Sequence, residues 1–238
     1  MFLRLELLEF RSLWWNYREV AERLQNDFQI IIPILDGHAG SDRNFTTIKD
    51  NATEIISFID MNFGGSVLLI GGLSLGGQIL LEMLSQRKNI CRFAMVESAE
   101  IIPSKLIYSL IKPVFGACYG FIRQKWFSKL QFRSLGMKPE LFIDYYQDTC
   151  GITKQNMLAF LQESSMYFIN KSLGECMAEI HLFVGERDNK RILFSARKLY
   201  ETLRKSSLHI LPTMYHGEFS INHSDLYAKE LCAIVKQH

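Results

Sequence analysis

The sequence predicts an α/β protein with a mostly parallel sheet covered by helices, and three observations support this fold class. Short apolar runs rich in β-branched residues alternate with segments whose apolar residues recur at helical spacing. Residues 101–176 break this alternation and contain helical patterns alone. A glycine-rich turn, "GGLSLGG", joins one apolar run directly to a helical segment. Apolar runs that alternate with helices are typical of parallel strands buried between two helical layers.

Five apolar runs are predicted as strands, and five periodic segments are predicted as helices around them. The predicted strands are residues 28–35, 66–70, 91–98, 179–184 and 207–212. The predicted helices are residues 16–28, 46–62, 75–87, 191–205 and 223–237. Thr46 or Thr47 is placed to cap the first turn of the second helix. Residues 2–10, "FLRLELLEF", fit either a strand or a helix.

The middle segment, residues 101–176, is predicted to form several short amphipathic helices rich in aromatic residues. An all-helical insertion between two strands is most simply a cap that lies over the strand ends. We therefore expect an α/β core made of residues 1–100 and 177–238, with the cap inserted between these two parts. Most aromatic residues of the cap are expected to pack it onto the core, because apolar helix faces are usually buried.

The overall composition argues against several classes of partner. The 238 residues include 27 basic and 25 acidic ones that look interleaved, so no one-sided field indicates nucleic acid or an anionic membrane. The five cysteines are scattered and odd in number, which is typical of reduced thiols in the cytoplasm. No histidine or cysteine cluster has metal-ligand spacing, no signal-peptide charge order is present, and no uninterrupted apolar run approaches membrane-spanning length. A soluble cytoplasmic protein without an integral membrane segment is expected, and no feature indicates its oligomeric state.

The turn "GLSLG", residues 72–76, fits the pattern G-x-S-x-G between a strand and a helix. This is the setting of a nucleophile elbow, in which a serine sits on a sharp, strained turn with its hydroxyl exposed. Glycines two positions before and after Ser74 leave room for the close approach of the backbone. The backbone N–H of Leu75, at the start of the helix, is placed to stabilise an oxyanion.

Two phosphate-binding loops are excluded on the same residues. Gly71 and Gly76 have the spacing of a Walker A loop, but Gly77 and Gln78 stand where a lysine and a serine or threonine are required. The dinucleotide-binding pattern G-x-G-x-x-G also fails, because Ser74 occupies the position of its second glycine. The elbow is therefore the preferred interpretation of this turn.

A serine nucleophile needs a histidine base and an acid that orients the histidine. After the strand at 179–184 the chain reads "GERD", which offers Asp188 and, less well placed, Glu186. After the last predicted strand it reads "TMYHGEF", which offers His216 followed by a glycine. The predicted triad is Ser74, Asp188 and His216, with Glu97 as a fallback acid. His181, His209 and His223 lie within strands or at a helix start, and we expect them to be structural.

These motifs together resemble those of the α/β-hydrolase-fold family, in its esterase and lysophospholipase-like form with a helical cap. The resemblance runs from about Trp14 to the C-terminus and rests on "GLSLGG", "GERD", "MYHGE" and "PILDGHAGSD". The last stretch is similar to a family loop written D-x-P-G-H-G-x-S, in which Gly37, His38 and Ser41 match. Three positions depart from that loop: Ile34, Asp36 and Ala39. The loop is a structural turn, so His38 is given no catalytic role.

The resemblance implies an eight-stranded, mostly parallel sheet and hydrolysis of carboxylic esters or thioesters without a cofactor. It also implies Ser74 as nucleophile, Asp188 as acid and His216 as base. One departure concerns the second oxyanion donor, which family members take from a His-Gly loop after an early strand. No glycine precedes Gly37 here, so the family's N-terminal strands are missing or atypical, or a backbone N–H of Ser12 or Leu13 replaces that donor.

Two functions follow as alternatives. The first is a serine hydrolase acting on a small-molecule apolar acyl ester or thioester held against the cap, with acyl transfer left open as its reaction. The second is a catalytically weak hydrolase-fold protein that binds a ligand or partner. The complete triad favours the first function, and the absent His-Gly loop favours the second.

Overall fold

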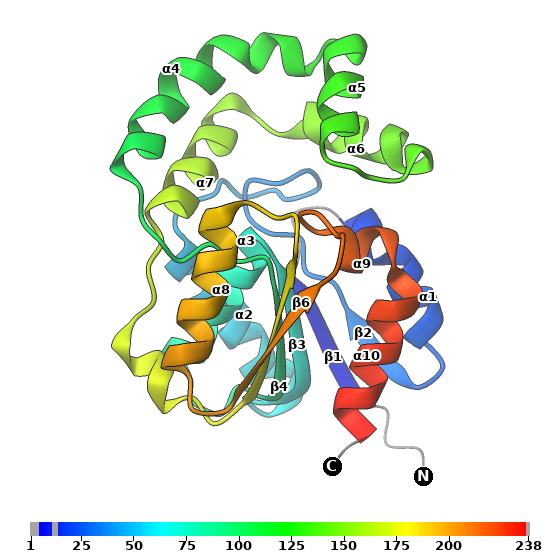
Figure 1. Ribbon diagram of the computed structural model, residues 1–238, viewed down its shortest axis with the longest axis vertical. Helices are drawn as coiled ribbons and strands as arrows, with labels where there is room; N and C mark the ends of the chain where they lie inside the picture. Colours follow the sequence, from blue (N-terminus) through cyan, green and yellow to red (C-terminus); the bar gives the residue numbers. More distant parts are fainter. Residues whose placement is uncertain (1–4, 11–13, 237–238) are drawn as a thin grey trace.

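A parallel sheet of six strands forms the centre of the molecule, as Figure 1 shows. The computed structural model describes residues 5–10 and 14–236. The strand order across the sheet is β2-β1-β3-β4-β5-β6, and every neighbouring pair is parallel. The strands are β1 (Leu5–Phe10), β2 (Phe28–Ile31), β3 (Val67–Leu73), β4 (Cys91–Glu97), β5 (Glu179–Gly185) and β6 (Ser206–Leu211). This arrangement confirms the predicted fold class.

Helices cover both faces of the sheet (Figure 1). One face is covered by α1 (Arg18–Leu24) and α10 (Ser224–Lys236), which share one buried apolar cluster with the sheet. The opposite face is covered by α2 (Ile48–Phe63), α3 (Leu75–Gln86) and α8 (Lys190–Thr202). Burial of one apolar stripe on each of these helices explains the helical spacing in their sequences.

Several local signals act as predicted. Thr47 caps α2, because its hydroxyl oxygen accepts a hydrogen bond of 2.9 Å from the backbone N–H of Asp50. Residues 2–10 fitted a strand or a helix, and residues 5–10 form β1 at the centre of the sheet. The strand predicted over 28–35 is shorter, since β2 ends at Ile31. Pro33 lies just beyond it and has no N–H for the ladder.

The eight strands implied by the family resemblance are not observed among the described residues, which contain six. The first described strand, β1, already lies between β2 and β3 at the centre of the sheet. The chain runs from β1 outward to β2 and then returns to β3 on the other side. The reversal creates a topological switch point at the carboxyl ends of β1 and β3, where open α/β sheets place their sites.

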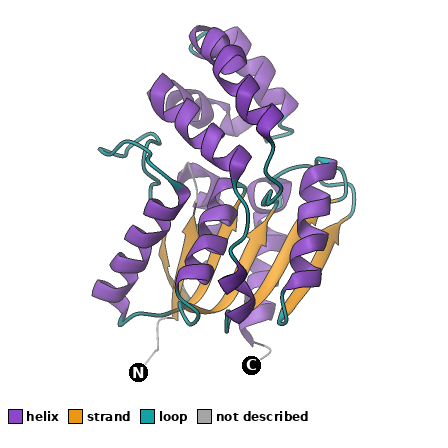
Figure 2. Ribbon diagram, turned by 90° about the vertical axis from the view of Figure 1, so that its left-hand side faces the viewer, coloured by secondary structure: helices purple, strands orange, loops and turns teal. Residues whose placement is uncertain are grey.

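The residues between β4 and β5 form helices only, in the part of the chain that the structure describes. They are α4 (Lys105–Ile122), α5 (Lys125–Ser134), η2 (Pro139–Leu141), α6 (Phe142–Gly151), α7 (Lys154–Met166) and η3 (Lys171–Glu175). Figures 1 and 2 show α4 to α7 above the carboxyl ends of the strands. The stretch after α7 returns to the core, where Tyr167 and Leu173 join the cluster beneath α3.

The five cysteines are all free, as expected. By length and composition, α4 is the one helix in the described part of the chain that could cross a membrane. Its apolar stretch includes Lys105 and Lys112, so it is not an uninterrupted apolar run.

Candidate active site

The turn between β3 and α3 has the geometry of a nucleophile elbow. Ser74 follows the last residue of β3 and has φ of 55° and ψ of −114°, a strained conformation for a residue with a side chain. Its N–H donates to the carbonyl oxygen of Glu97 at 2.9 Å, and its own carbonyl accepts from the N–H of Gln78 at 3.0 Å. These two bonds hold Ser74 between β4 and the first turn of α3.

The glycines around Ser74 are required by contact with the backbone. A Cβ atom on Gly72 would lie 2.5 Å from the carbonyl oxygen of Gly76, closer than real Cβ atoms come. A Cβ atom on Gly77 would lie 3.0 Å from the Cβ of Ala99. Gly72, the glycine two positions before Ser74, thus lies where β3 and α3 cross too closely for a side chain.

Asp188 and His216 meet at the carboxyl ends of β5 and β6. Nδ1 of His216 lies 3.2 Å from Oδ1 and 3.3 Å from Oδ2 of Asp188. The Asp188 side chain is almost fully buried, at 1% exposure, while that of His216 is 38% exposed. A buried carboxylate that accepts a hydrogen bond from Nδ1–H leaves Nε2 of the histidine free to accept a proton.

Asp188 is held in its ionised form. Burial is the largest single influence on it and raises its pKa, but the hydrogen bond and charge of His216, the nearby Ser98 hydroxyl and the N–H of Asn189 together bring the pKa below its ordinary value. The N–H of Asn189 donates to Oδ1 of Asp188 at 2.7 Å. Hydrogen bonding to the charged form outweighs desolvation here.

The histidine loop lies against the elbow. Gly217 follows His216 and has φ of +73°, and a Cβ atom on it would lie 2.9 Å from Cδ2 of Leu73. Leu73 immediately precedes Ser74, so the residues flanking the predicted base and nucleophile are in contact. The loop also packs on the end of β5, where a Cβ atom on Gly185 would lie 2.3 Å from the carbonyl oxygen of Met214.

The alternative acids have other partners. Glu186 accepts a hydrogen bond of 2.9 Å from the N–H of Thr213 and so helps to shape the histidine loop. Glu97, at the end of β4, is 3% exposed and lies near the N–H of Ser220, at 3.4 Å. Asp188 contacts the ring of His216.

Four other described histidines have contacts or positions of their own. His38 is buried, its Nδ1 lies 3.0 Å from the carbonyl oxygen of Asp36, and its ring stacks on Phe160 of α7 at 4.7 Å. His181 and His209 lie in β5 and β6, and the Ser207 hydroxyl contacts both at 2.9 Å. His223 ends α9 (Glu218–Asn222). These places agree with the structural roles expected for them.

The oxyanion donors can be placed only in part. Leu75 is the first residue of α3, so its N–H has no acceptor within the helix and points from the positive end of the helix dipole. Ser12 and Leu13, considered as the second donor, lie outside the described residues. β1 ends at Phe10, which is in register with Gly72, so the chain leaves the sheet beside the elbow.

A cavity of about 350 Å³ adjoins the Asp188–His216 pair. Its other lining residues are Ser134, Leu135, Arg187, Asn189, Ile192 and Tyr215. Ser134 and Leu135 come from the end of α5 and the residue after it, so the helical segment forms one wall of the site. These lining residues were not predicted, because the spacing of a sequence does not reveal which insertion residues reach the sheet edge.

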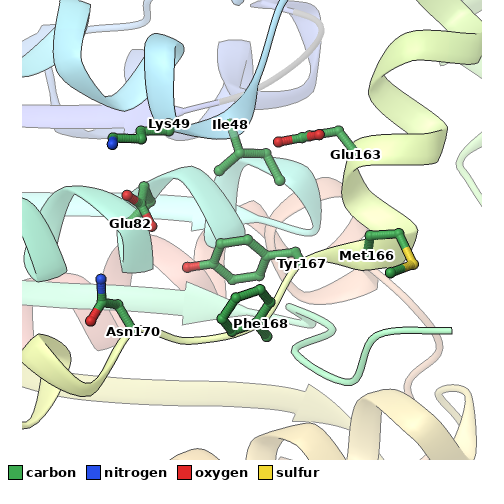
Figure 3. A pocket seen from close by; sticks show the side chains of 8 residues that line it. All are labelled: Ile48, Lys49, Glu82, Glu163, Met166, Tyr167, Phe168 and Asn170. Atoms are coloured by element: carbon green, nitrogen blue, oxygen red, sulfur yellow. The ribbon is translucent and has the colours of Figure 1, made fainter.

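A second cavity, of about 410 Å³, opens on the flank of the molecule between α2, α3 and the end of α7 (Figure 3). Ile48, Tyr167 and Phe168 give it an apolar wall, and Glu163 points toward it. Burial raises the pKa of Glu163. The cavity contains no predicted catalytic residue, and its position differs from that of the switch point.

Ser98 is a functional candidate that sequence reasoning missed. It follows the last residue of β4 and has φ of 51°, and its N–H donates to the carbonyl oxygen of Phe183 at 2.9 Å. Among the described residues its buried hydroxyl makes no hydrogen bond, but it lies near Asp188 and helps to lower the pKa of that carboxyl. A serine directly after a buried strand was the available signal. Among the described residues, no cluster of three or more His, Cys, Asp or Glu could hold a metal ion.

The fold is similar to that of solved esterases and hydrolases, although no protein-family model and no curated protein matches the sequence. An esterase from Exiguobacterium antarcticum superposes with a TM-score of 0.82 at 15% identity, covering 98% of this chain and 92% of its own. A thermophilic esterase from Thermogutta terrifontis superposes with a TM-score of 0.77 at 16% identity, covering 98% and 89%. A 2-hydroxy-6-oxo-6-phenylhexa-2,4-dienoate hydrolase from Rhodococcus gives 0.76 at 14% identity, covering 99% and 91%.

Proposed function

We propose that the protein is a serine hydrolase that cleaves a carboxylic ester or thioester of an apolar acyl substrate. The observation that carries this proposal is the Asp188–His216 pair, at 3.2 Å, on a loop that contacts the residue before a strained Ser74. The similarity to solved esterases and hydrolases supports the same reaction class. The apolar composition of the insertion supports an apolar substrate, although polar side chains form most of the cavity beside the pair and Ser74 does not line it.

In the proposed reaction, Nε2 of His216 takes the hydroxyl proton of Ser74 as Oγ attacks the carbonyl carbon. The N–H of Leu75 stabilises the negative oxygen of the tetrahedral intermediate. The leaving alcohol or thiol departs with the proton from His216, and an acyl-serine remains. Water, deprotonated by His216, then attacks the acyl group and regenerates Ser74. Asp188 orients the ring and stabilises the imidazolium through its ionised carboxylate.

The proposal includes a division of the chain into an α/β core, residues 1–100 and 177–238, and a cap, residues 101–176. Two contacts support it: the cap supplies Ser134 and Leu135 to the cavity, and Phe160 of the cap stacks on His38 of the core. In this arrangement the core supplies the chemistry and the cap shapes the acyl pocket. We also propose a cytoplasmic location, because all five cysteines are free.

The second candidate function is a binding protein with the same fold and little turnover. The specific observation in its favour is the sequence before Gly37, which has no glycine and therefore no His-Gly loop. Loss of one oxyanion donor lowers turnover by about a hundredfold to a thousandfold. The two candidates therefore differ in rate far more than in the reactivity of Ser74.

A fluorophosphonate probe followed by a panel of p-nitrophenyl esters of increasing chain length tests the proposal. We expect the probe to label Ser74, and Ser74→Ala and His216→Ala to abolish labelling. Ser57→Ala, an exposed serine of α2, is the matched control and should label like the unmodified chain. Labelling with ester turnover supports the hydrolase, labelling with very slow turnover supports the binding protein, and a folded chain without labelling overturns an activated Ser74.

A further inference from the structure

The outer side of α4 carries a stripe of exposed apolar side chains. Its members follow one another at intervals of four, four and seven residues, which places them on one face of the helix. They are Leu106, Leu110, Val114 and Phe121, with exposures of 69%, 48%, 50% and 51%. The buried residues of α4, Ile111 and Ile122, lie on another face. In Figure 1 α4 forms the outer edge of the helical layer, with α7 between it and the sheet.

The next helix, α5, contacts α4 through the rings of Phe121 and Phe127 and carries exposed apolar side chains of its own. Trp126 and Leu130, one turn apart, are 64% and 62% exposed. Lys125, Lys129 and Arg133 form an exposed row beside them at the same four-residue interval. An exposed tryptophan with a basic row on one helix is typical of helices that lie in a membrane interface.

The charge of the chain is segregated toward this surface. Residues 101–139 contain seven of the 27 basic residues and none of the 25 acidic ones, so the rest of the chain has 20 basic against 25 acidic residues. Within the described residues, only Lys138 of these seven forms an ion pair, with Glu19. The other six are Lys105, Lys112, Arg123, Lys125, Lys129 and Arg133. They are exposed, although Arg123 also contacts the carbonyl oxygen of Cys150 and the ring of Tyr119.

We propose that the α4–α5 face, meaning these exposed apolar and basic side chains, docks the protein on the surface of an anionic phospholipid bilayer. The apolar stripe would enter the interface between headgroups and acyl chains, and the lysines and arginines would contact lipid phosphates. Charge complementarity favours this occupant over a second copy of the chain, because two copies of a strongly basic face, in which Glu140 is the acidic neighbour of Lys129 and Arg133, would repel each other. The inference does not depend on the proposed function.

The helix lies on the bilayer in this proposal and does not span it. α4 passes a test of length and composition for a spanning helix, but Lys112 stands near its middle and Pro113 follows. Its inner face packs against α7, and Ile111 and Ile122 are buried there. A spanning helix would have to leave this packing and carry Lys112 to the centre of the bilayer, which is costly.

Flotation of the full chain with vesicles tests the proposal. We expect it to float with vesicles of phosphatidylcholine and phosphatidylserine, to stay behind with phosphatidylcholine alone, and to be released by high salt. The double variant Trp126→Ser with Lys129→Glu should bind anionic vesicles at least tenfold more weakly. Phe194→Ser with Lys198→Glu on α8 makes the same kinds of change at exposed positions and should bind like the unmodified chain.

Circular dichroism checks that both double variants are folded, so that a loss of flotation reports on docking. Exposed positions should tolerate these changes without unfolding. The proposal is overturned if the folded chain does not float with anionic vesicles, or if both double variants bind equally. Binding that resists high salt and alkaline carbonate would show a spanning helix and overturn it as well. A dimer in light scattering that the α5 variant alone disrupts would show that a second copy occupies this face.

Discussion

Two apolar helices, α3 and α4, differ completely in burial. Eight of the 12 residues of α3 are buried, whereas two of the 18 residues of α4 are. α3 follows a central strand and packs on the sheet with α2 and η3 beside it, so most of its surface meets protein. α4 has its main neighbour, α7, on one side. An apolar helix face therefore indicates a surface that packs against something. The position of the helix in the fold decides whether the same chain or another molecule covers that surface.

The largest expected effect is on ester turnover, and it should differ between a variant of the predicted catalytic acid and a variant of the exposed surface of α4. Asp188→Asn should lower ester turnover by about 10⁴-fold, because the amide favours the wrong tautomer of His216. The exposed change Leu110→Ser should leave turnover of a soluble ester within about twofold, since surface substitutions away from a site have small effects. Steady-state assays with p-nitrophenyl esters measure both.

Glu97→Gln is the matched control for the acid, because it removes the other buried carboxylate at the strand ends. A larger loss for Glu97→Gln than for Asp188→Asn would assign the acid to Glu97. If Leu110→Ser lowered turnover as much as Asp188→Asn, α4 would belong to the catalytic machinery, and the assignment of the chemistry to the core would be wrong.

The second prediction concerns packing in the same two helices. Leu80→Ala in α3 removes a side chain with 0% exposure and should lower the free energy of unfolding by about 2–5 kcal/mol. Leu106→Ala in α4, at 69% exposure, should change it by less than about 0.5 kcal/mol. Urea denaturation followed by circular dichroism measures both. Equal destabilisation by the two variants would mean that α4 is buried in solution, for example in a dimer.

The core was predictable from the sequence because its signals are local. The β-branched runs, the Thr47 cap and the elbow glycines each specify nearby backbone, and β3 to β6 and α2, α3, α8 and α10 follow them. The Asp188–His216 contact was predicted from chain order and strand ends, which place both residues at one edge of a parallel sheet. The prediction of this contact uses the rule that parallel strands bring their carboxyl ends together.

The features that could not be predicted depend on packing between segments that are distant in the sequence. The exposure of α4 cannot be read from its sequence, which resembles that of a buried helix. The expectation that charges are interleaved is wrong for residues 101–139, where the basic excess is hidden by a near-neutral total. The role of Ser98 depends on a strained turn, and the insertion residues of the cavity depend on how α5 lies against the loops after β5 and β6.

His38 connects the core to the helices above it, and the smallest predicted effect concerns this contact. It lies in the loop after β2, is 4% exposed, and stacks on Phe160 of α7. Burial lowers its pKa and outweighs the backbone hydrogen bonds at Asp36 and Leu35, which favour the charged ring. The folded protein therefore holds His38 neutral at a pH where an unfolded chain, with its ordinary histidine pKa of about 6.5, already binds a proton.

The sign follows from proton linkage: in this window the unfolded state binds more protons, so stability rises with pH. The contribution of His38 is complete above about pH 6.5 and is lost as the pH falls toward the lowered value. Comparing pH 7.5 with pH 5.5, we expect the amide protection of α7 to fall more than that of α3, as measured by hydrogen exchange corrected for intrinsic rates. His38→Gln, which retains an N–H donor for the Asp36 carbonyl, should remove this extra loss. An equal loss in α3 and α7, or the same loss in the His38→Gln variant, would show that His38 does not control the contact between the core and the helices above it.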